Sequence, residues 1–240
     1  MISSMKPKIF LQCLQEGFTL AKSSLDIFLI SLPLSLFSFL SIFIHDSLFG
    51  TLNLIALLLS SSFNMSLPLF LQKKQLNGKS NYKGILLITL KSTKRIILPG
   101  LLIFFILAVI LIALVIAIYS IIPLSQAQIQ VVAKSSLIWW KIFFAVLSIL
   151  LLIFEFTSFY FSLENKGLFE SMRRSILTAF RNLPYLFYLT VINLVAFLLA
   201  LLVPAESQIG QFAISIVSFF IRFILTSTTF IYYQKVIKKT

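Results

Sequence analysis

The sequence predicts an all-α integral membrane protein with six transmembrane helices, and three observations lead to this class. Of the 240 residues, 59% are hydrophobic and only 11% are charged, and the mean hydropathy is +1.03. The apolar residues, mainly Leu, Ile and Phe, collect in long runs, close to the ~20 residues that a helix needs to cross a bilayer. The chain contains only seven Gly and seven Pro. A soluble domain of this length could not bury so much apolar surface, and such runs favour helices over barrel strands.

Six apolar runs are expected to cross the membrane within one domain that covers residues 1–240. Their approximate limits are 24–44, 49–72, 96–122, 137–163, 185–203 and 212–233. The first run begins too far from the N-terminus for a cleavable signal peptide, and no small-residue cleavage site follows it. We therefore expect this run to be retained as the first span.

The basic residues predict the orientation of these spans. Three of the 20 lie before residue 24, seven lie between 73 and 95, four between 166 and 181, and three after 234. All 17 fall on one side if the N-terminus is cytoplasmic, whereas only Lys134 falls in an outer loop. Cytoplasmic loops are the ones that carry excess Lys and Arg. Both termini are therefore predicted to be cytoplasmic.

The net charge of +13 follows from this topology and does not indicate nucleic-acid binding. The basic residues flank the apolar runs and do not form one dense patch interleaved with exposed aromatic residues. Such residues attract anionic lipid headgroups, at ~1 kcal/mol for each nearby Lys or Arg. Membrane lipids are the expected partners, and protein partners or further copies of this chain are compatible with the sequence.

The segment from Gly167 to Phe180 is predicted to form an amphipathic helix on the cytoplasmic surface. Its apolar residues recur at spacings of three and four: Leu168, Phe169, Met172, Ile176 and Phe180. Its opposite face carries the charged residues Glu170, Arg173, Arg174 and Arg181. Glu170 and Arg174 also form an i,i+4 pair in the favourable order. Residues 82–95 and 8–22 are weaker examples of the same pattern.

These three segments predict an internal repeat. Each has a Gly near its start and a Pro in the first turns of the following apolar run, separated by 16, 15 and 17 residues in Gly17 to Pro33, Gly84 to Pro99 and Gly167 to Pro184. The repeated unit would be a surface helix followed by a helical hairpin, used three times. Gly and Pro also occur near helix ends for local reasons, so coincidence is the alternative explanation.

The stretch LENKGLFESMRRSILTAFRNL, residues 163–183, resembles the segment after the fourth span of a family of bacterial six-span proteins. This family is the glycerophosphoryl diester phosphodiesterase membrane-domain and YciC-like group. The matching positions are Glu164, Gly167, Ser171, Arg174, Ser175 and Asn182. The resemblance implies a multi-pass protein of the bacterial plasma (inner) membrane, of uncharacterised function. It implies no diesterase activity, because the family name comes from an adjoining enzyme domain.

Polar residues inside the predicted spans are the candidate functional residues, because charge in hydrocarbon is costly. Asn64, Glu155 and Asn193 each lie eight residues from the cytoplasmic end of their span, which is ~12 Å along a helix. Arg222 lies eleven residues from its end, or ~17 Å. We therefore expect these four side chains, from four spans, to form one intramembrane polar layer.

Two interpretations of this layer are compatible with the sequence. In the first, Glu155 and Arg222 form a buried ion pair and the two Asn side chains join helices by hydrogen bonds. In the second, the layer is a water-accessible cavity in which Glu155 exchanges a proton or faces a cation and Arg222 holds an anionic group such as a lipid phosphate.

Other residues give no sign of catalysis. His45 and Asp46 are adjacent and lack a third ligand, and the chain has no P-loop, dinucleotide turn, HExxH or GxSxG motif. We expect no metal, no cofactor and no enzymatic activity. Tyr232 and Tyr233 are predicted to belong to an interfacial aromatic belt, and the single Cys13 cannot form an internal disulfide.

The expected function is therefore that of a non-enzymatic membrane component, a scaffold or accessory subunit that acts on lipids or partner proteins. The alternative is a small transporter or lipid-translocating protein built around Glu155 and Arg222.

Overall fold

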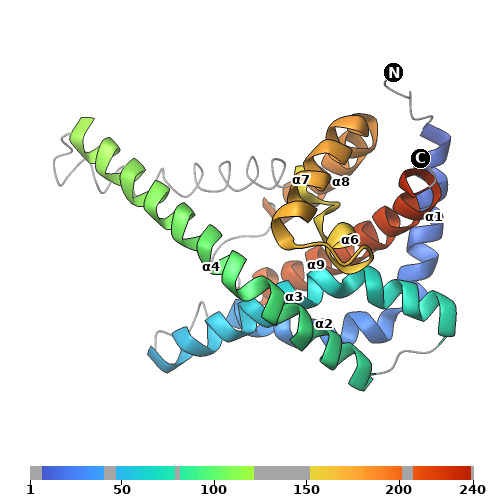
Figure 1. Cartoon of the computed structure of the whole chain (residues 1–240), viewed down its shortest axis with the longest axis horizontal. Helices are drawn as coiled ribbons and strands as arrows, with labels where there is room; N and C mark the ends of the chain where they lie inside the picture. The colour runs from blue at the N-terminus through green and yellow to red at the C-terminus, as the bar shows by residue number, and fades with distance from the viewer. Residues whose placement is uncertain (1–6, 41–46, 79–81, 122–151, 202–207, 239–240) are drawn as a thin grey trace.

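The computed structural model describes residues 7–40, 47–78, 82–121, 152–201 and 208–238, and these ranges are helical, with no strand among them (Figure 1). The predicted all-α class is confirmed for these residues. In chain order the elements are α1 (Pro7–Ser23), α2 (Leu25–Leu40), α3 (Ser47–Asn77), α4 (Tyr82–Ile121), η2 (Leu152–Phe154), α6 (Thr157–Ser162), α7 (Leu168–Arg181), α8 (Leu183–Leu201), α9 (Gln208–Tyr232) and η3 (Tyr233–Ile237).

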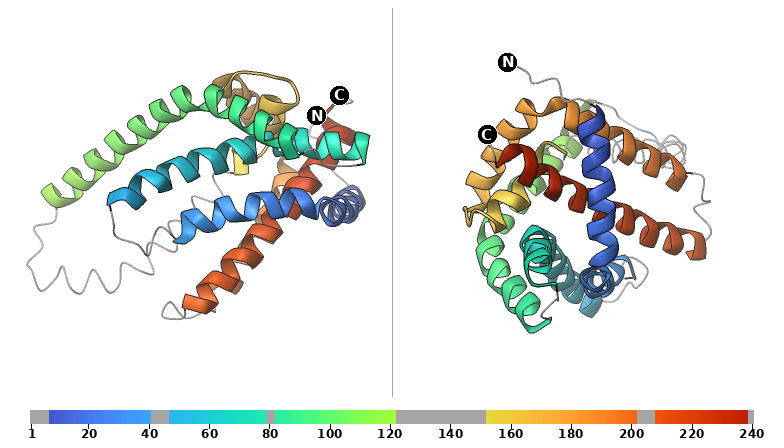
Figure 2. Two further views of the ribbon diagram at one scale, coloured as in Figure 1. Left: turned by 90° about the horizontal axis from the view of Figure 1, so that it is seen from below. Right: turned by 90° about the vertical axis from the view of Figure 1, so that its right-hand side faces the viewer.

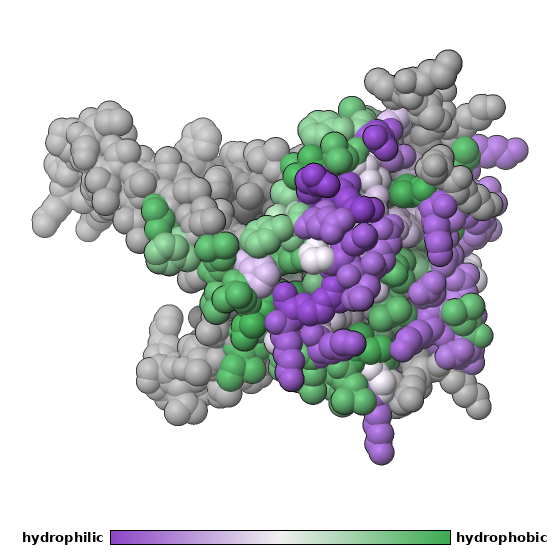
Figure 3. Space-filling view, viewed as in Figure 1, coloured by the Kyte–Doolittle hydropathy of each residue, from purple (hydrophilic) through white to green (hydrophobic). Residues whose placement is uncertain are grey.

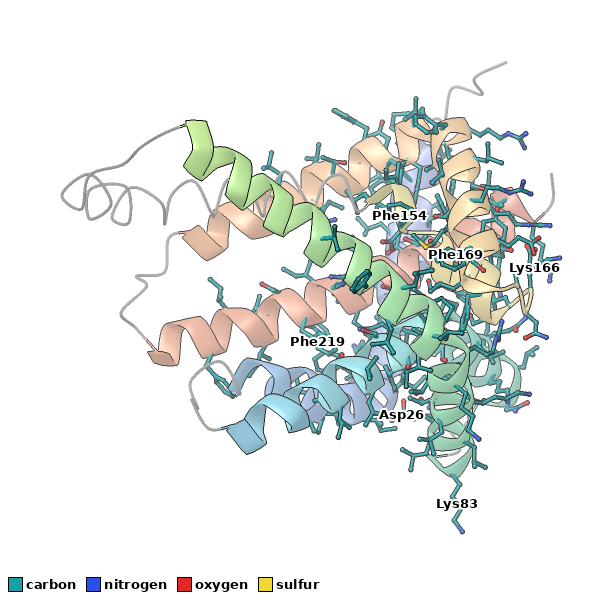
Figure 4. The ribbon with its side chains drawn as sticks, turned by 60° about the vertical axis from the view of Figure 1, so that its left-hand side comes forward. Asp26, Lys83, Phe154, Lys166, Phe169 and Phe219 are labelled. Atoms are coloured by element: carbon teal, nitrogen blue, oxygen red, sulfur yellow. The ribbon has the colours of Figure 1, made fainter. Side chains whose placement is uncertain are left out.

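The long helices run in one general direction away from a common end of the molecule. Figure 4 shows α2, α3, α4, α8 and α9 extending from the end at which Lys83 and Lys166 lie. The same end carries α1, α6 and α7. Hydrophilic residues gather there, and hydrophobic residues flank them on the side toward the long helices (Figure 3). The described structure therefore has one polar end and an apolar body.

Helix α1 crosses α9 at the polar end (Figure 2, right). Its buried residues, Phe10, Cys13, Gly17 and Ala21, recur at spacings of three and four and form one stripe. At Gly17 the two helices approach so closely that an added Cβ would lie 2.5 Å from the Thr228 Cα. Burial raises the pKa of the Cys13 thiol, because the interior disfavours the thiolate.

Polar contacts join other elements at this end. The Lys74 ammonium lies 2.8 Å from a carboxylate oxygen of Asp26, which links the end of α3 to the start of α2. Lys235, near the C-terminus, forms an ion pair with Glu16 of α1. The hydrogen bond from Lys235 holds the pKa of Glu16 below its ordinary value. The start of α2, the end of α3, the described C-terminal residues and α1 therefore lie together.

Helix α4 presents an apolar face that no described residue covers. Leu98, Leu101, Leu102, Phe105 and Val109 are between 49% and 76% exposed and share one face at helical spacing. Together with Pro99 and with Phe169 of α7, most of them line an apolar surface groove of about 660 Å³. A continuous exposed apolar surface of this kind is typical of contact with lipid or with a partner protein.

One helix of the described residues, Phe212–Ile237, is long and apolar enough to cross a membrane by length and composition. The apolar segment Leu183–Val195 is shorter. Of the predicted spans, 49–72 lies within α3, 96–122 almost wholly within α4, and 212–233 within α9 and η3. Most of 24–44 lies within α2 and most of 185–203 within α8. Residues 41–44 and 137–151 of the predicted spans lie outside the residues whose placement is described.

The predicted surface helices differ in how they join the following helix. α1 ends before Ser24 and α7 ends before Asn182, so each is separate from α2 or α8. By contrast, the expected segment 82–95 and the span after it form the single helix α4, which is bent (Figure 2, left). Pro99 lies inside α4 and removes one backbone hydrogen bond, which accounts for a bend without a break.

Two local predictions were wrong. The described end of span 137–163 is not one helix, because Glu155 and Phe156 form a turn between η2 and α6. Tyr232 and Tyr233 are each 2% exposed, so they belong to the protein core and not to a lipid-facing belt. They bury their rings because Tyr185 and Phe159 stack on them.

The sequence pattern of α7 left open which face of the helix packs inward. Gly167 is its N-cap, so the helix begins where predicted. Its buried residues are Leu168, Ser171, Ser175, Thr178 and Ala179, whereas Phe169, Leu177 and Phe180 are 52% to 59% exposed. The small side chains face the bundle because they let α7 approach it closely, and the large apolar side chains face outward.

Candidate functional site

A cavity of about 600 Å³ lies between α3, the segment around the helix break, α7 and α9. Phe154, before the break, and Phe219, on α9, both line it, and Figure 4 shows the positions of these two residues. Most of its wall is apolar, but polar side chains from three elements also face it. The cavity therefore combines charged groups with a hydrophobic surface, as ligand sites commonly do.

Three of the four residues of the predicted polar layer line this cavity: Asn64 of α3, Glu155 at the helix break and Arg222 of α9. Asn193 of α8 does not line it. Its side-chain amide donates a hydrogen bond of 2.9 Å to the Leu189 carbonyl of its own helix. An equal distance from a helix end fixes the height of a residue along the helix axis but not the direction in which its side chain points. The side chain of Asn193 points in a different direction from the other three.

Glu155 occupies the turn between η2 and α6 and contacts α9. One of its carboxylate oxygens lies 3.3 Å from the Thr229 hydroxyl. That hydroxyl accepts a hydrogen bond of 2.8 Å from the buried Tyr185 side chain. It also lies 2.9 Å from the Leu225 carbonyl, so its single proton is shared between two acceptors. The carboxylate thus has one weak partner and keeps capacity to accept further hydrogen bonds.

Arg222 does not form an ion pair with Glu155 in the described part of the chain, although its charge acts on that carboxylate. The side chain of Arg222 is exposed at the cavity. Within the described ranges its guanidinium has no hydrogen-bond partner. The closed ion pair of the first interpretation is therefore not the arrangement observed, and the two opposite charges face a common space.

Two further donors in this cavity lack partners in the part of the chain that is described. The Thr157 hydroxyl belongs to a residue only 2% exposed, and it makes no hydrogen bond. The Asn64 side chain also makes none. A buried polar atom without a partner costs ~1–3 kcal/mol unless a water or ligand satisfies it. The Thr157 hydroxyl is therefore available to donate a hydrogen bond to a polar group in the cavity.

Neighbouring helices support the break that exposes Glu155. The Ser175 hydroxyl of α7 donates a hydrogen bond of 2.9 Å to the Ile153 carbonyl, a group at the interrupted helix. Arg95 of α4 donates to the carbonyls of Phe161 and Lys166, at 3.4 and 2.5 Å. Its guanidinium also lies 4.0 Å from the centre of the Phe161 ring. Ser175 thus supports the backbone just before the turn, and Arg95 holds the end of α6 and the loop that follows it.

Some charged residues of α7 form ion pairs, and others are exposed on its surface. The predicted Glu170–Arg174 pair is present, with 2.9 Å between nitrogen and oxygen. Arg174 also lies 3.3 Å from a carboxylate oxygen of Glu164, which accepts a hydrogen bond from Tyr233. Arg173 and Arg181 are exposed. Arg173 and Arg181 thus remain on the surface, whereas Arg174 is linked to Tyr233 through Glu164.

The segment that carries the family resemblance is dense in such contacts. Asn182 accepts a hydrogen bond of 2.6 Å from Tyr232 and donates one of 2.8 Å to Thr178. Ser171 donates to the Gly167 carbonyl at 2.8 Å. With the bonds of Glu164, Arg174 and Ser175, every matching position has a structural partner. The segment joins the helix break, α7 and the end of α9.

Sequence reasoning missed the roles of Thr157, Thr229 and Tyr185. Thr157 stands two residues after Glu155, and a helical interpretation turns the two side chains apart, whereas the break brings both to the cavity. Thr229 stands in the polar run Thr226–Thr229 of α9, which was a visible signal. Tyr185 stands near the start of an apolar run, and nothing in its sequence surroundings signals its contact with Thr229.

Comparison with known proteins adds no function to this geometry. No family model matches the chain, and neither curated proteins nor solved structures give a match. The site must be interpreted from its own residues.

Proposed function

We propose that this chain is a multi-pass integral protein of the bacterial plasma membrane, a non-enzymatic component that acts on lipids or partner proteins. It crosses the membrane six times, in three units of a surface helix and a hairpin, with both termini in the cytoplasm. The family named above is the group to which we assign it. The observation that carries the proposal is the separation of the molecule into one polar end and an apolar body (Figure 3).

The exposed residues support this assignment. Exposed apolar residues recur on one face of α4 from Leu98 to Val109, a stretch of twelve residues. Phe187, Val191 and Val195 of α8 are 43% to 64% exposed. In water these faces would favour aggregation, whereas hydrocarbon is their natural surroundings. At 1.5 Å per residue, the 31 residues of α3 and the 40 of α4 exceed the ~30 Å of a bilayer core.

The proposed topology is supported by what lies together at the polar end. The ion pairs of Lys74 with Asp26 and of Lys235 with Glu16 join segments that the proposal assigns to the cytoplasm. Helix α7 adds exposed Arg173 and Arg181 beside exposed Phe169 and Phe180. Such a helix suits a position in the headgroup region, with its aromatic residues toward the acyl chains and its arginines toward anionic lipid.

Reporter fusions test the topology. An enzyme active only outside the cytoplasm and a fluorescent protein that folds only inside would each be fused after residues 45, 78, 130, 166, 206 and 240. The expected result is fluorescence at 78, 166 and 240 and external activity at 45, 130 and 206. External activity after residue 166 or 240, or extraction of the protein by alkaline carbonate, would contradict the proposal.

A second function is favoured by one observation, the cavity with its unpaired opposite charges. We infer a small transporter or lipid-translocating protein in which Glu155 and Arg222 contact the transported group. Transporter sites are often formed by interrupted helices in the membrane interior, lined by polar groups that close packing would not need. The break at Glu155 and the unpartnered Thr157 fit that description.

Adjacent cysteines on α9 test whether this cavity is reached from the cytoplasm. Thr226 lines it, whereas the next residue, Ser227, is fully buried. In a Cys13→Ala background, an impermeant maleimide added to inside-out vesicles should label Thr226→Cys and leave Ser227→Cys unlabelled. If both cysteines are equally protected, the cavity interpretation is wrong. If both are equally labelled, the variants have lost the packing of α9.

A further inference from the structure

We propose that the cavity binds a zwitterionic phospholipid headgroup, with the phosphate at Arg222, Asn64 and Thr157 and a primary ammonium at Glu155. This inference rests on the second function proposed above and specifies its ligand. The argument has three steps: the donors that lack partners, the position of the carboxylate, and the apolar remainder of the wall.

The unpartnered groups on this cavity suit an anion with several acceptor oxygens. Within the described residues, Arg222 contributes a guanidinium, Asn64 an amide and Thr157 a hydroxyl, and none has a hydrogen-bond partner. Arg presents a planar set of donors that fits phosphate oxygens bidentately. Thr157 is 2% exposed, so its donor is already desolvated and a phosphate oxygen would satisfy it. These three groups therefore form the phosphate end of the site.

Glu155 makes the site selective between headgroups. Its carboxylate faces the same cavity and is not neutralised by contact with Arg222. A ligand with negative charge alone would place that charge near this carboxylate, which is unfavourable in a medium of low dielectric constant. A ligand that carries a positive group beside its phosphate removes the repulsion. A primary ammonium also donates N–H groups to the carboxylate, which a quaternary ammonium cannot do.

The rest of the wall favours a lipid over a free phosphate compound. Phe63, Leu67, Phe154, Phe219 and Phe223 line the cavity beside the polar groups. At about 600 Å³ the cavity is within the range of sites for organic ligands. A bare phosphate would leave this apolar surface in contact with water. The glycerol and upper acyl segments of a lipid would cover it while the headgroup reaches Arg222.

Binding to delipidated full-length protein in mild detergent tests the proposal. The probes are dioleoyl phosphatidylethanolamine, phosphatidylcholine and phosphatidylglycerol, together with glycerophosphoethanolamine, which has the headgroup but no acyl chains. Native mass spectrometry and thermal stability measure binding. We expect the ethanolamine lipid to bind about tenfold or more tightly than the other two lipids, because one charge-assisted hydrogen bond contributes this much. It should also bind more tightly than glycerophosphoethanolamine, which cannot cover the apolar wall with acyl chains.

Three variants separate the cavity from surface electrostatics. Arg222→Gln should weaken binding of the ethanolamine lipid about tenfold or more, and Glu155→Gln should abolish its preference over phosphatidylcholine. Arg173→Gln removes an exposed charge from α7, outside the cavity, and should leave the preference unchanged. If Arg173→Gln weakens binding as much as Arg222→Gln, headgroups bind to the surface and the proposal fails.

Other outcomes are equally decisive. Tighter binding of phosphatidylglycerol would overturn the role of Glu155, and equal binding of glycerophosphoethanolamine would identify a free phosphate compound as the ligand. The cysteine labelling described above distinguishes the two failures. If Thr226→Cys is labelled and no lipid preference is found, the cavity stands and the lipid proposal is wrong. If Thr226→Cys is protected, the second function itself fails.

Discussion

Replacing Gly17 with alanine tests how α1 packs on α9. The added Cβ would lie 2.5 Å from the Cα and Oγ1 of Thr228 and 2.7 Å from its backbone nitrogen. Ordinary contact distances are roughly 3.5–4.0 Å, so α1 would have to move away by about 1 Å. Two of the three atoms belong to the backbone of α9, which cannot rotate aside. Movement of the whole helix is the only relief.

The expected loss of stability in Gly17→Ala is the difference between two opposing effects. Overpacking of a well-packed contact costs ~1–3 kcal/mol, and a backbone clash belongs at the upper end. Replacing glycine with alanine inside a helix stabilises the helix by ~1 kcal/mol. The net loss is therefore about 2 kcal/mol, or a fall in melting temperature of about 4–8 °C for a chain of this size.

The assay compares Gly17→Ala with Gly100→Ala, a substitution in another helix interior. At Gly100 an added Cβ meets only the Ile96 side chain at 3.7 Å, an ordinary contact. Samples in mild detergent are heated, and the monodisperse fraction is measured by size-exclusion chromatography. Gly100→Ala should melt at or slightly above the wild-type temperature. If the melting temperature of Gly17→Ala equals that of Gly100→Ala, the close approach of α1 and α9 is wrong.

Three further predictions concern the polar end. Arg95→Gln should lower the melting temperature by several degrees, because two backbone carbonyls lose their donor, whereas the exposed Lys94→Gln should change it little in the same assay. Glu16 has a lowered pKa because Lys235 donates to it, so its contribution to stability is present above its ordinary pKa of 4.5 and is lost as the pH falls below it. The stability difference between wild type and Glu16→Gln should therefore shrink from pH 6 to pH 3, and a difference that grows would refute this pairing. Cys13 should react with maleimide much more slowly in the folded protein than in denaturant, because it is 1% exposed and burial raises its pKa.

Hydropathy and charge predicted those features of this fold that depend only on the spacing of residues along the chain. The all-helical class and the start of α7 at Gly167 follow from composition and periodicity. So does the Glu170–Arg174 pair, because its partners are one helical turn apart. Such features depend on local geometry, which sequence spacing determines. No knowledge of neighbouring helices was needed.

The inward face of α7 could not be predicted in the same way. Periodicity identified Phe169 and Phe180 as its apolar face, and in water that face would pack inward. Here both are exposed and Ser171 and Ser175 are buried. Hydropathy alone does not distinguish an apolar side chain that faces lipid from one that faces protein, since both surroundings are apolar. Small size, which permits close approach, was the better guide to the buried face.

The break at Glu155 depends on residues that sequence proximity does not connect. An apolar run with one acidic residue predicts a continuous span, and nothing adjacent to Glu155 signals a turn. The carbonyl of Ile153, just before the turn, accepts a hydrogen bond from Ser175, twenty-two residues further along the chain. After the turn, the carbonyl of Phe161 accepts a hydrogen bond from Arg95. Since these donors come from other helices, the break is a property of the assembled bundle.

The same break accounts for the separation of the opposite charges of Glu155 and Arg222. A continuous helix would let Glu155 and Arg222 close into an ion pair, whose stabilisation rarely exceeds that of well-packed apolar residues. The turn instead directs Glu155 toward Thr229 and leaves Arg222 exposed at the cavity. Ser175 binds the Ile153 carbonyl beside this turn and so helps to keep Glu155 in its position. Two opposite charges that face one cavity without contact between them suit a ligand with charges of both signs, and that is the reason to seek its ligand among zwitterions.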